Sequence, residues 1–194
     1  MLYEDEKSQK LVENTLKQYQ KATDTAKDIF IKKTKDYGTA WRILRPSSLT
    51  DQLFIKASRI RSIQEKGQSK VDDPIDLEFV GVINYSVMAL IQLEHTDISE
   101  LEMPVEEVEK LYDHYIKVAC DLMQNKNHDY GEAWRDMRVS SITDLILMKL
   151  LRVKKIEDND GKTIISEGLD ANYLDMINYA VFAMILIDEE KENK

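Results

Sequence analysis

The sequence predicts an all-α fold, a helical bundle of two duplicated three-helix repeats related by a pseudo-twofold axis. The first observation is an internal repeat, because residues 33–51 and 126–144 are identical at twelve of nineteen aligned positions. The second is composition, since only six glycines and three prolines in 194 residues favour helices over a turn-rich β architecture. The third is hydrophobic periodicity, which follows helical spacing along most of the chain.

Three helices are expected in the first repeat. Gly38 follows the first of them and is a candidate for the left-handed residue that ends it. Ser48 or Thr50 can cap the start of the second, because both side chains accept hydrogen bonds from free backbone N–H groups. The first expected helix spans residues 6–33, the second runs from this cap to about residue 66, and the third spans residues 76–94.

The same elements recur in the second repeat, where Pro104 suits the first position of a helix. The expected helices are 105–127, 142–157 and 169–189. We therefore divide the chain into a first repeat (1–95), an acidic linker (96–104) and a second repeat (105–194). Each three-helix unit has an apolar face that the other covers, so the two repeats are expected to form one compact domain.

Charge and cysteine usage restrict the possible partners and compartment. A formal net charge of −9 argues against non-specific binding to nucleic acid or to an anionic membrane. The most apolar run, Met176 to Ile187, is too short to span a bilayer. Cys120 is the single cysteine, which fits a reducing compartment, and the acidic N-terminal sequence has no apolar signal-peptide core. A cytoplasmic protein is expected.

Charged residues that occur in both copies need an explanation, because solvated helix faces usually diverge after duplication. Lys149 and Arg152 are three residues apart, so they share one face of the second helix of the second repeat. With Lys126 and Arg138 they form a cationic set that suits a phosphate group. The alternative is an internal salt-bridge network in which these cations pair with Asp129, Asp144 and Asp175.

The third helix of the second repeat carries a polar stripe on an otherwise apolar sequence, formed by Asn172, Asp175, Asn178 and Tyr179. Burial of an unpaired carboxylate or amide costs several kcal/mol, so these groups need partners, and Asp175 needs a cation or a metal. The first copy has Glu78 and Gly81 in place of Asn172 and Asp175. Asp175 is therefore the candidate for a function confined to the second repeat.

Other residues of the second copy extend this candidate site. The second copy has His128 where the first has Lys35, and Glu167 where the first has Asp73, while Asp129 matches Asp36. Together with Asp175, these three residues provide groups for acid–base work or metal binding. Oxygen ligands from Asp175 and Glu167 would suit Mg²⁺. Tyr130 and Trp134 either hold the turn to the core or line the base and sugar of a nucleotide.

These motifs together resemble a known family. The motifs are Lys126-Asn127-His128-Asp129-Tyr130-Gly131 with Trp134, then Asp144, Lys149 and Arg152, then Asn172 to Tyr179. They resemble the nucleotide-modification-associated domain of the first type, and the duplication resembles its tandem-repeat members. The resemblance implies a role in the metabolism of modified nucleotides. A looser similarity to the all-α nucleoside triphosphate pyrophosphatases lacks their paired-glutamate motif, because Glu106-Glu107-Val108-Glu109-Lys110 has a different spacing.

The leading hypothesis is a helical protein that binds a nucleotide or nucleotide-like phosphate in its second repeat, and the sequence leaves open whether it also acts on this ligand with Mg²⁺. The expected phosphate ligands are Lys126, Arg138, Lys149 and Arg152; the expected catalytic residues are Asp175, Asp129 and His128; the expected metal ligands are Asp175 and Glu167; and the expected nucleotide-lining residues are Tyr130, Trp134, Asn172, Asn178 and Tyr179. The alternative is a non-enzymatic helical scaffold or interaction module. A homodimer is compatible with either.

Overall fold

The computed structural model is an all-α bundle, which confirms the predicted fold class. It describes residues 2–67, 74–97 and 99–193, with side chains from Lys10 onward. Asp73, the counterpart of Glu167, lies outside these residues. The α-helices are α1 (Leu2–Tyr37), α2 (Pro46–Lys66), α3 (Ile75–Glu94), α4 (Val105–Tyr130), α5 (Val139–Asp158) and α6 (Leu169–Glu192). Two short 3₁₀-helices, η1 (Ala40–Ile43) and η2 (Ala133–Asp136), complete the repeats.

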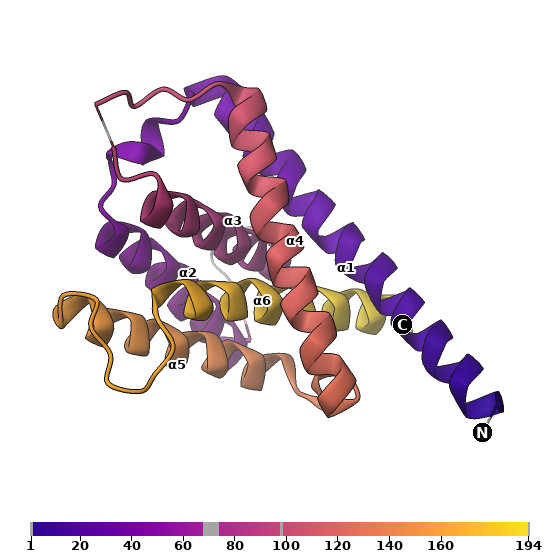
Figure 1. The fold of residues 1–194 in the computed structure, drawn as a ribbon. Coiled ribbons are helices and arrows are strands. Elements are labelled where there is room, and N and C mark those ends of the chain that lie inside the picture. Colours follow the sequence, from indigo (N-terminus) through magenta and orange to yellow (C-terminus); the bar gives the residue numbers. More distant parts are fainter. Residues whose placement is uncertain (1, 68–73, 98, 194) are drawn as a thin grey trace.

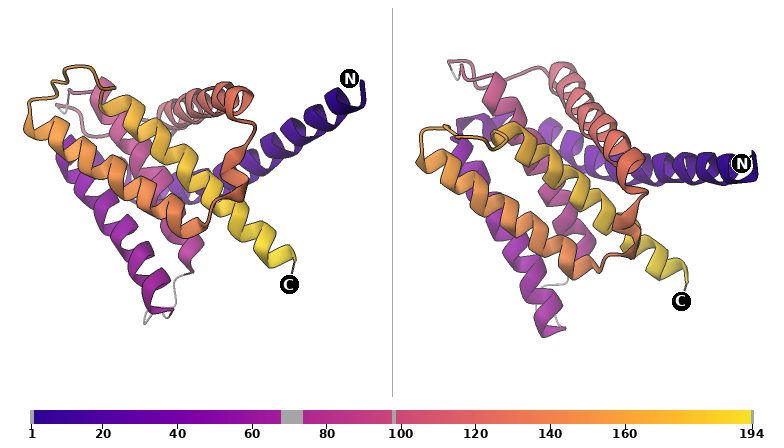
Figure 2. Two further views of the ribbon diagram at one scale, coloured as in Figure 1. Left: turned by 90° about the horizontal axis from the view of Figure 1, so that it is seen from below. Right: turned by 60° about the horizontal axis from the view of Figure 1, so that its bottom comes forward.

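The helices are arranged in three layers, with the third helix of each repeat in the middle. Helices α3 and α6 pack against each other, and α2 and α5 pack against each other and against this pair on one side (Figure 1). Helices α1 and α4 cross on the other side, and the N-terminal part of α1 extends beyond the body of the bundle (Figure 2). The core therefore surrounds the two most apolar helices.

Matching contacts in the two repeats support the predicted pseudo-twofold relation. Tyr112 OH donates to Asn84 Oδ1 at 2.9 Å, and Asn84 Nδ2 donates to the Ala26 carbonyl at 3.1 Å. Their counterparts repeat this arrangement, because Tyr19 donates to Asn178 at 2.8 Å and Asn178 donates to the Ala119 carbonyl at 2.9 Å. Each asparagine thus joins the first helix of its own repeat to that of the other. The repeats are interlocked through their buried amides.

The first helix of each repeat ends at a glycine, as the sequence predicts. Gly38 and Gly131 have φ values of 63° and 61°, in the left-handed region, and each donates its N–H to the carbonyl four residues earlier. A 3₁₀-helix follows each glycine and carries the tryptophan of the repeat. The chain thereby turns back over the end of the helix and directs its aromatic side chain at α3 or α6.

The second helices begin earlier than expected. Helix α2 starts at Pro46 and α5 at Val139, with Arg45 and Arg138 in extended backbone conformation just before them. The expectation that Ser48 or Thr50 caps α2 is therefore wrong, because Pro46 supplies a first helical residue that needs no N–H partner. Thr50 lies inside the helix, and its hydroxyl bonds Glu157 and Tyr173 of the second repeat.

Helix α3 is long and apolar enough to cross a membrane if length and composition alone are considered. Two thirds of this window (67%) is buried inside the bundle, as in the core helix of a soluble protein. Sequence analysis selected the run in α6 as the most apolar, and both helices lie in the middle layer (Figure 1). Their apolar character is accounted for by burial between the outer helices.

Candidate functional site

Three charged residues of the second repeat meet at one point in the bundle. Lys126 Nζ lies 2.6 Å from Asp175 Oδ1, and Lys149 Nζ lies 2.6 Å from Asp175 Oδ2. The three side chains come from α4, α5 and α6, so each helix of the repeat contributes one group. Asp175 has the cationic partners that its burial requires, and its pairing with both lysines is the contact that the salt-bridge alternative predicted. We refer to Lys126, Lys149 and Asp175 as the second-repeat triad.

Burial distinguishes the two lysines of this triad. The side chains of Lys149 and Asp175 are each 7% exposed, whereas that of Lys126 is 45% exposed. Burial lowers the pKa of Lys126, but its hydrogen bond to Asp175 and the carboxylate charge outweigh this effect and raise the pKa above the usual value. Glu167 Oε2 reaches to 4.0 Å from Lys149 Nζ and is itself exposed. Lys126 therefore remains charged beside this buried carboxylate.

Arg152 and Tyr179 lie beside the triad. Arg152 is exposed, and within the described part of the chain it forms no ion pair. Tyr179 is half-buried, and its pKa is raised by burial and by Asp175, with an opposing effect from the positive charges of Lys126 and Arg152. Among the residues that the structure describes, Arg152 is thus a cation at the edge of the triad without a carboxylate partner.

Three of the predicted site residues do not join the triad. Arg138 precedes α5 and is exposed, with no ion pair among the described residues. His128 and Asp129 contact each other at 3.2 Å, and their side chains are 90% and 73% exposed. His128 lines a groove with residues of the N-terminal half of α1. Sequence spacing alone did not reveal that the last turn of α4 directs Lys126 and His128 to different faces.

The residues expected to line a nucleotide are mostly engaged within the protein. Asn178 forms the contact to Tyr19 and Ala119 described above, and Asn172 Nδ2 donates to the Gly168 carbonyl at 2.7 Å. Tyr130 is 74% exposed. Trp134 stacks on Phe182, with ring centroids 4.2 Å apart and an interplanar angle of 4°. For Trp134 the geometry agrees with the alternative that the tryptophan holds the turn to the core.

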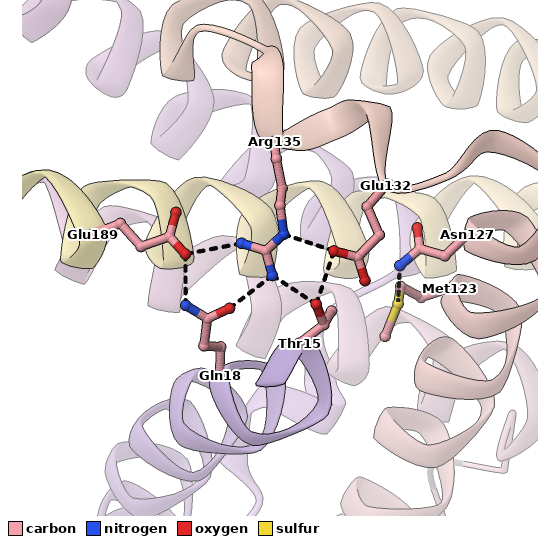
Figure 3. A network of polar contacts seen from close by, with 7 residues as sticks. All are labelled: Thr15, Gln18, Met123, Asn127, Glu132, Arg135 and Glu189. Carbon is pink, nitrogen blue, oxygen red and sulfur yellow. Dashed lines mark hydrogen bonds and ion pairs between the residues drawn. The ribbon is translucent and has the colours of Figure 1, made fainter. Parts of the chain in front are cut away.

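Arg135, the next residue after Trp134, fixes this turn through a polar network (Figure 3). Its guanidinium donates to Glu132 at 2.6 Å and to Glu189 at 2.9 Å. It also donates to Thr15 at 2.6 Å and to Gln18 at 2.8 Å, both on α1. The network joins the turn to α1 and α6, as Figure 3 shows. An arginine found in both copies is here a structural residue.

The counterpart of Arg135 in the first repeat uses different partners. Arg42 is buried and donates to the carbonyl groups of His95 and Asp97 in the linker. Gln92 Nε2 adds hydrogen bonds to the carbonyl groups of Arg42 and Leu44 at 2.8 and 2.9 Å. The first arginine thus holds the linker, whereas the second holds the terminal helices. Both 3₁₀-helices are fastened, so the tryptophans that they carry are fixed in position.

A cavity of about 680 Å³ lies in the first repeat, whereas the sequence predicted a function confined to the second repeat. Its polar and aromatic lining includes Lys33, Trp41, Lys56, Glu78 and Tyr85. These residues come from α1, η1, α2 and α3, and the counterparts of the three α-helices in the second repeat, α4, α5 and α6, carry the triad. The sequence signal that was missed is the pair of small or flexible residues, Gly81 and Met88, at positions held by Asp175 and Phe182.

The two repeats neutralise the lysine of their second helix differently. In the second repeat Lys149 pairs with Asp175, whereas in the first its counterpart Lys56 reaches Glu78 Oε2 at 3.1 Å. Arg59 also pairs with Glu78. The carboxylate has therefore moved by one helical turn along the third helix. Gly81 makes room for this, because a Cβ there would lie 3.2 Å from the Lys56 side chain.

The carboxylates near the triad determine whether a metal ion could bind there. No group of three or more His, Cys, Asp or Glu side chains suited to hold a metal ion occurs among the residues that the structure describes. Asp175 and Glu167 both lie near Lys149, so they provide at most a two-carboxylate set. Mg²⁺ is commonly bound by one or two carboxylates together with substrate phosphates. Both Asp175 oxygens are held by lysine ammonium groups, so a metal ion at Asp175 would have to displace them.

Fold and site together define a duplicated helical domain in which each repeat has one lysine on its first helix and one on its second, lining a cavity in the first repeat and contacting Asp175 in the second. A family model described as nucleotide modification associated domain 1 matches residues 33–93 and again residues 126–187. The chain therefore belongs to this family, as a tandem-repeat member. The two matches contain both lysine pairs and both tryptophans. Neither a search of curated proteins nor one of solved structures gave a match.

Proposed function

We propose that this protein binds a nucleotide or nucleotide-like phosphate through the lysines and arginines of its repeat unit. Family membership indicates a nucleotide-related role, which it favours over a purely structural scaffold. The finer proposal concerns the chemistry of binding. Phosphate binding would explain why an acidic protein directs cationic side chains into the interior of each repeat.

The observation that carries the proposal is the lysine pair present in both repeats. Lys33 and Lys56 line one cavity, and Lys126 and Lys149 contact one carboxylate. Each pair comes from the first and second helices and lies against the third. Two ammonium groups held together repel each other unless an anion lies between them. In the second repeat Asp175 is such an anion, and a phosphate group would have the same effect.

In the second repeat we assign phosphate contacts to Lys126 and Arg152, because both have exposed side chains beside Asp175. Lys149 would bind from the buried side, and Asp175 with Glu167 would hold Mg²⁺ or act as a base. A phosphate with Mg²⁺ would bring its own charge, so that Lys149 could exchange Asp175 for a phosphate oxygen. A ligand would have to extend toward the end of α4 to contact Arg138, His128 and Asp129. We also propose a cytoplasmic location.

Ligand binding is tested by thermal unfolding in the presence of deoxynucleotides, with and without Mg²⁺. A ligand that binds only the folded protein stabilises it by about 2.7 kcal/mol at a hundredfold excess over Kd. We expect a concentration-dependent rise in Tm with at least one deoxynucleotide. Arg152→Ala should reduce this rise, whereas the control Arg61→Ala, an exposed arginine that pairs with Glu65 in α2, should not. Absence of any shift at millimolar concentrations would contradict the proposal.

A further inference from the structure

We propose that the first repeat holds its own nucleotide site, in the cavity between α1, η1, α2 and α3, and that its ligand is a nucleoside monophosphate. This inference rests on the proposed function and assigns that function to a second place in the molecule. The sequence predicted a functional site only in the second repeat, because Asp175 and His128 have no identical counterparts in the first. The observations below concern the geometry of the first repeat.

The cavity has the size and lining of a small-molecule site. Its volume of about 680 Å³ falls within the range of roughly 300–1,000 Å³ that is usual for ligand pockets. Aromatic side chains line several sides, among them Trp41, Tyr37 and Tyr85. The turn that carries Trp41 is fixed to the linker through Arg42 and Thr39, whose Oγ1 donates to the Leu101 carbonyl at 2.6 Å. The wall formed by Trp41 is therefore held in place before any ligand binds.

The charged groups of the cavity differ in depth. The Glu78 side chain is 3% exposed, and both Lys56 and Arg59 contact it. Lys33 is exposed, and it forms no ion pair within residues 10–67, 74–97 and 99–193. Counting Lys33, Lys56, Arg59 and Glu78, the cavity and its edge carry a net charge of about +2 at neutral pH. The cavity would therefore attract an anionic ligand whose charged group binds at the mouth of the cavity.

The second repeat fills the corresponding space with its own side chains. Asp175 lies between Lys126 and Lys149, and Phe182 covers Trp134 in a stacked arrangement. At the equivalent positions the first repeat has Gly81 and Met88, both of which line the cavity. Gly81 has no carboxylate to place between Lys33 and Lys56. The difference between a filled and an open site is thus attributable to two positions on the third helix.

These features together define the class of ligand. A planar base would contact Trp41 in place of the phenyl ring that covers Trp134 in the other repeat, because aromatic rings stack favourably on both bases and side chains. Lys33 at the mouth would bind the phosphate. Glu78 at the inner end accepts hydrogen bonds, which suits a base that carries an amino group. A nucleoside monophosphate satisfies all three conditions within the available volume.

The two tryptophans allow the repeats to be followed separately, since the chain has only Trp41 and Trp134. Trp134→Phe leaves the reporter in the first repeat, and Trp41→Phe leaves the reporter in the second. We would titrate each variant with the four deoxynucleoside 5′-monophosphates and record tryptophan fluorescence, with calorimetry on the wild-type protein. The inference predicts saturable quenching of Trp41 by at least one of them, most strongly by a base with an amino group.

Lys33→Ala in the Trp41-only protein should weaken this binding roughly tenfold or more, since a charge-assisted hydrogen bond is lost. Lys32→Ala is the matched control, because the neighbouring lysine pairs with Asp28 on the exposed side of α1 and should leave binding unchanged. Binding that is detected by calorimetry but does not change Trp41 fluorescence would overturn the inference and leave the proposed function intact. No binding of any monophosphate by either method would also overturn the inference, and the thermal-unfolding test with deoxynucleotides decides the proposed function separately.

Discussion

The two repeats share their fastening residues and differ in what the third helix places between the lysines. In the second repeat Asp175 occupies that position, and in the first it is Gly81, with the carboxylate one turn earlier at Glu78. Lys56 and Lys149 are thus both neutralised, by different residues. After duplication, the requirement for a neutralised lysine persisted, while the position of the carboxylate changed. That change separates a filled site from an open one.

Replacement of the two tryptophans should give the largest contrast between the repeats. Trp134→Ala should cost about 3–5 kcal/mol of unfolding free energy, because a buried ring stacked on Phe182 is lost. Trp41→Ala should cost clearly less, because Trp41 is only half-buried and lines the cavity. Urea unfolding of both variants measures the difference. Equal losses would mean that the first-repeat cavity is not open in solution.

Removal of the third-helix carboxylates is the next test. Asp175→Ala leaves the buried Lys149 ammonium without its partner, which should cost about 3 kcal/mol or more. Glu78→Ala should cost less, because the side chains of Lys56 and Arg59 are 31% and 28% exposed and can reach water. Chemical denaturation of the two variants provides the comparison. A larger loss for Glu78→Ala would contradict the different burial of the two lysines.

The asparagines offer a comparison in which the repeats should behave alike. Asn84→Ala and Asn178→Ala each remove one hydrogen bond from a tyrosine and one to a backbone carbonyl. Leaving such buried groups unpaired costs about 1–3 kcal/mol each, so both variants should be destabilised to a similar extent. Thermal unfolding tests this equality. A strong effect of one substitution and a negligible effect of the other would argue against the pseudo-twofold equivalence.

The smallest expected effect on stability concerns the contact between Thr50 and Glu157 and its counterpart between Thr143 and Gln64, because only the first of these contacts includes an ionisable side chain. Burial raises the pKa of Glu157, which accepts a hydrogen bond from Thr50, whereas its counterpart Gln64 donates to Thr143. Because the folded protein binds this proton more tightly than the unfolded chain does, the contribution of Glu157 becomes more favourable as pH falls from neutral through the raised pKa.

Glu157→Gln should therefore change stability by less than about 0.5 kcal/mol at neutral pH and flatten this part of the pH dependence. Measurements of Tm from neutral pH down to the usual glutamate pKa of 4.5 would reveal it. Gln64→Ala, at the matching position in α2, serves as a control that removes a hydrogen bond without changing a charge. An unchanged pH profile in Glu157→Gln would contradict the assigned cause.

Much of the fold follows from local sequence. Helical periodicity placed every helix, and the left-handed glycines follow from the need to end α1 and α4 before the tryptophan turns. The starts of α2 and α5 were less predictable, because several capping residues follow one another and only the chain direction after η1 and η2 selects among them. Thr50 was misassigned for this reason, as its real partners come from the other repeat.

The candidate site was only partly predictable. The pairing of Asp175 with lysines follows from the cost of an isolated buried carboxylate, so the sequence indicated it. The role of Glu78 was not visible, because a partner one turn away breaks the residue-by-residue alignment of the copies. An open cavity depends on side-chain volumes such as those of Met88 and Phe182, which matter only once the helices are in contact.

The most direct test of the account is to give the first repeat the carboxylate of the second. Gly81→Asp would place an acid between Lys33 and Lys56, and its Cβ alone requires a shift of only a few tenths of an ångström of the Lys56 side chain. Isothermal titration of the folded variant with the nucleoside monophosphate that quenches Trp41 is the deciding measurement. We predict a loss of affinity of at least about tenfold, since a carboxylate competes with the phosphate for the same lysines. Unchanged affinity would contradict the claim that the third-helix carboxylate determines whether a repeat is open.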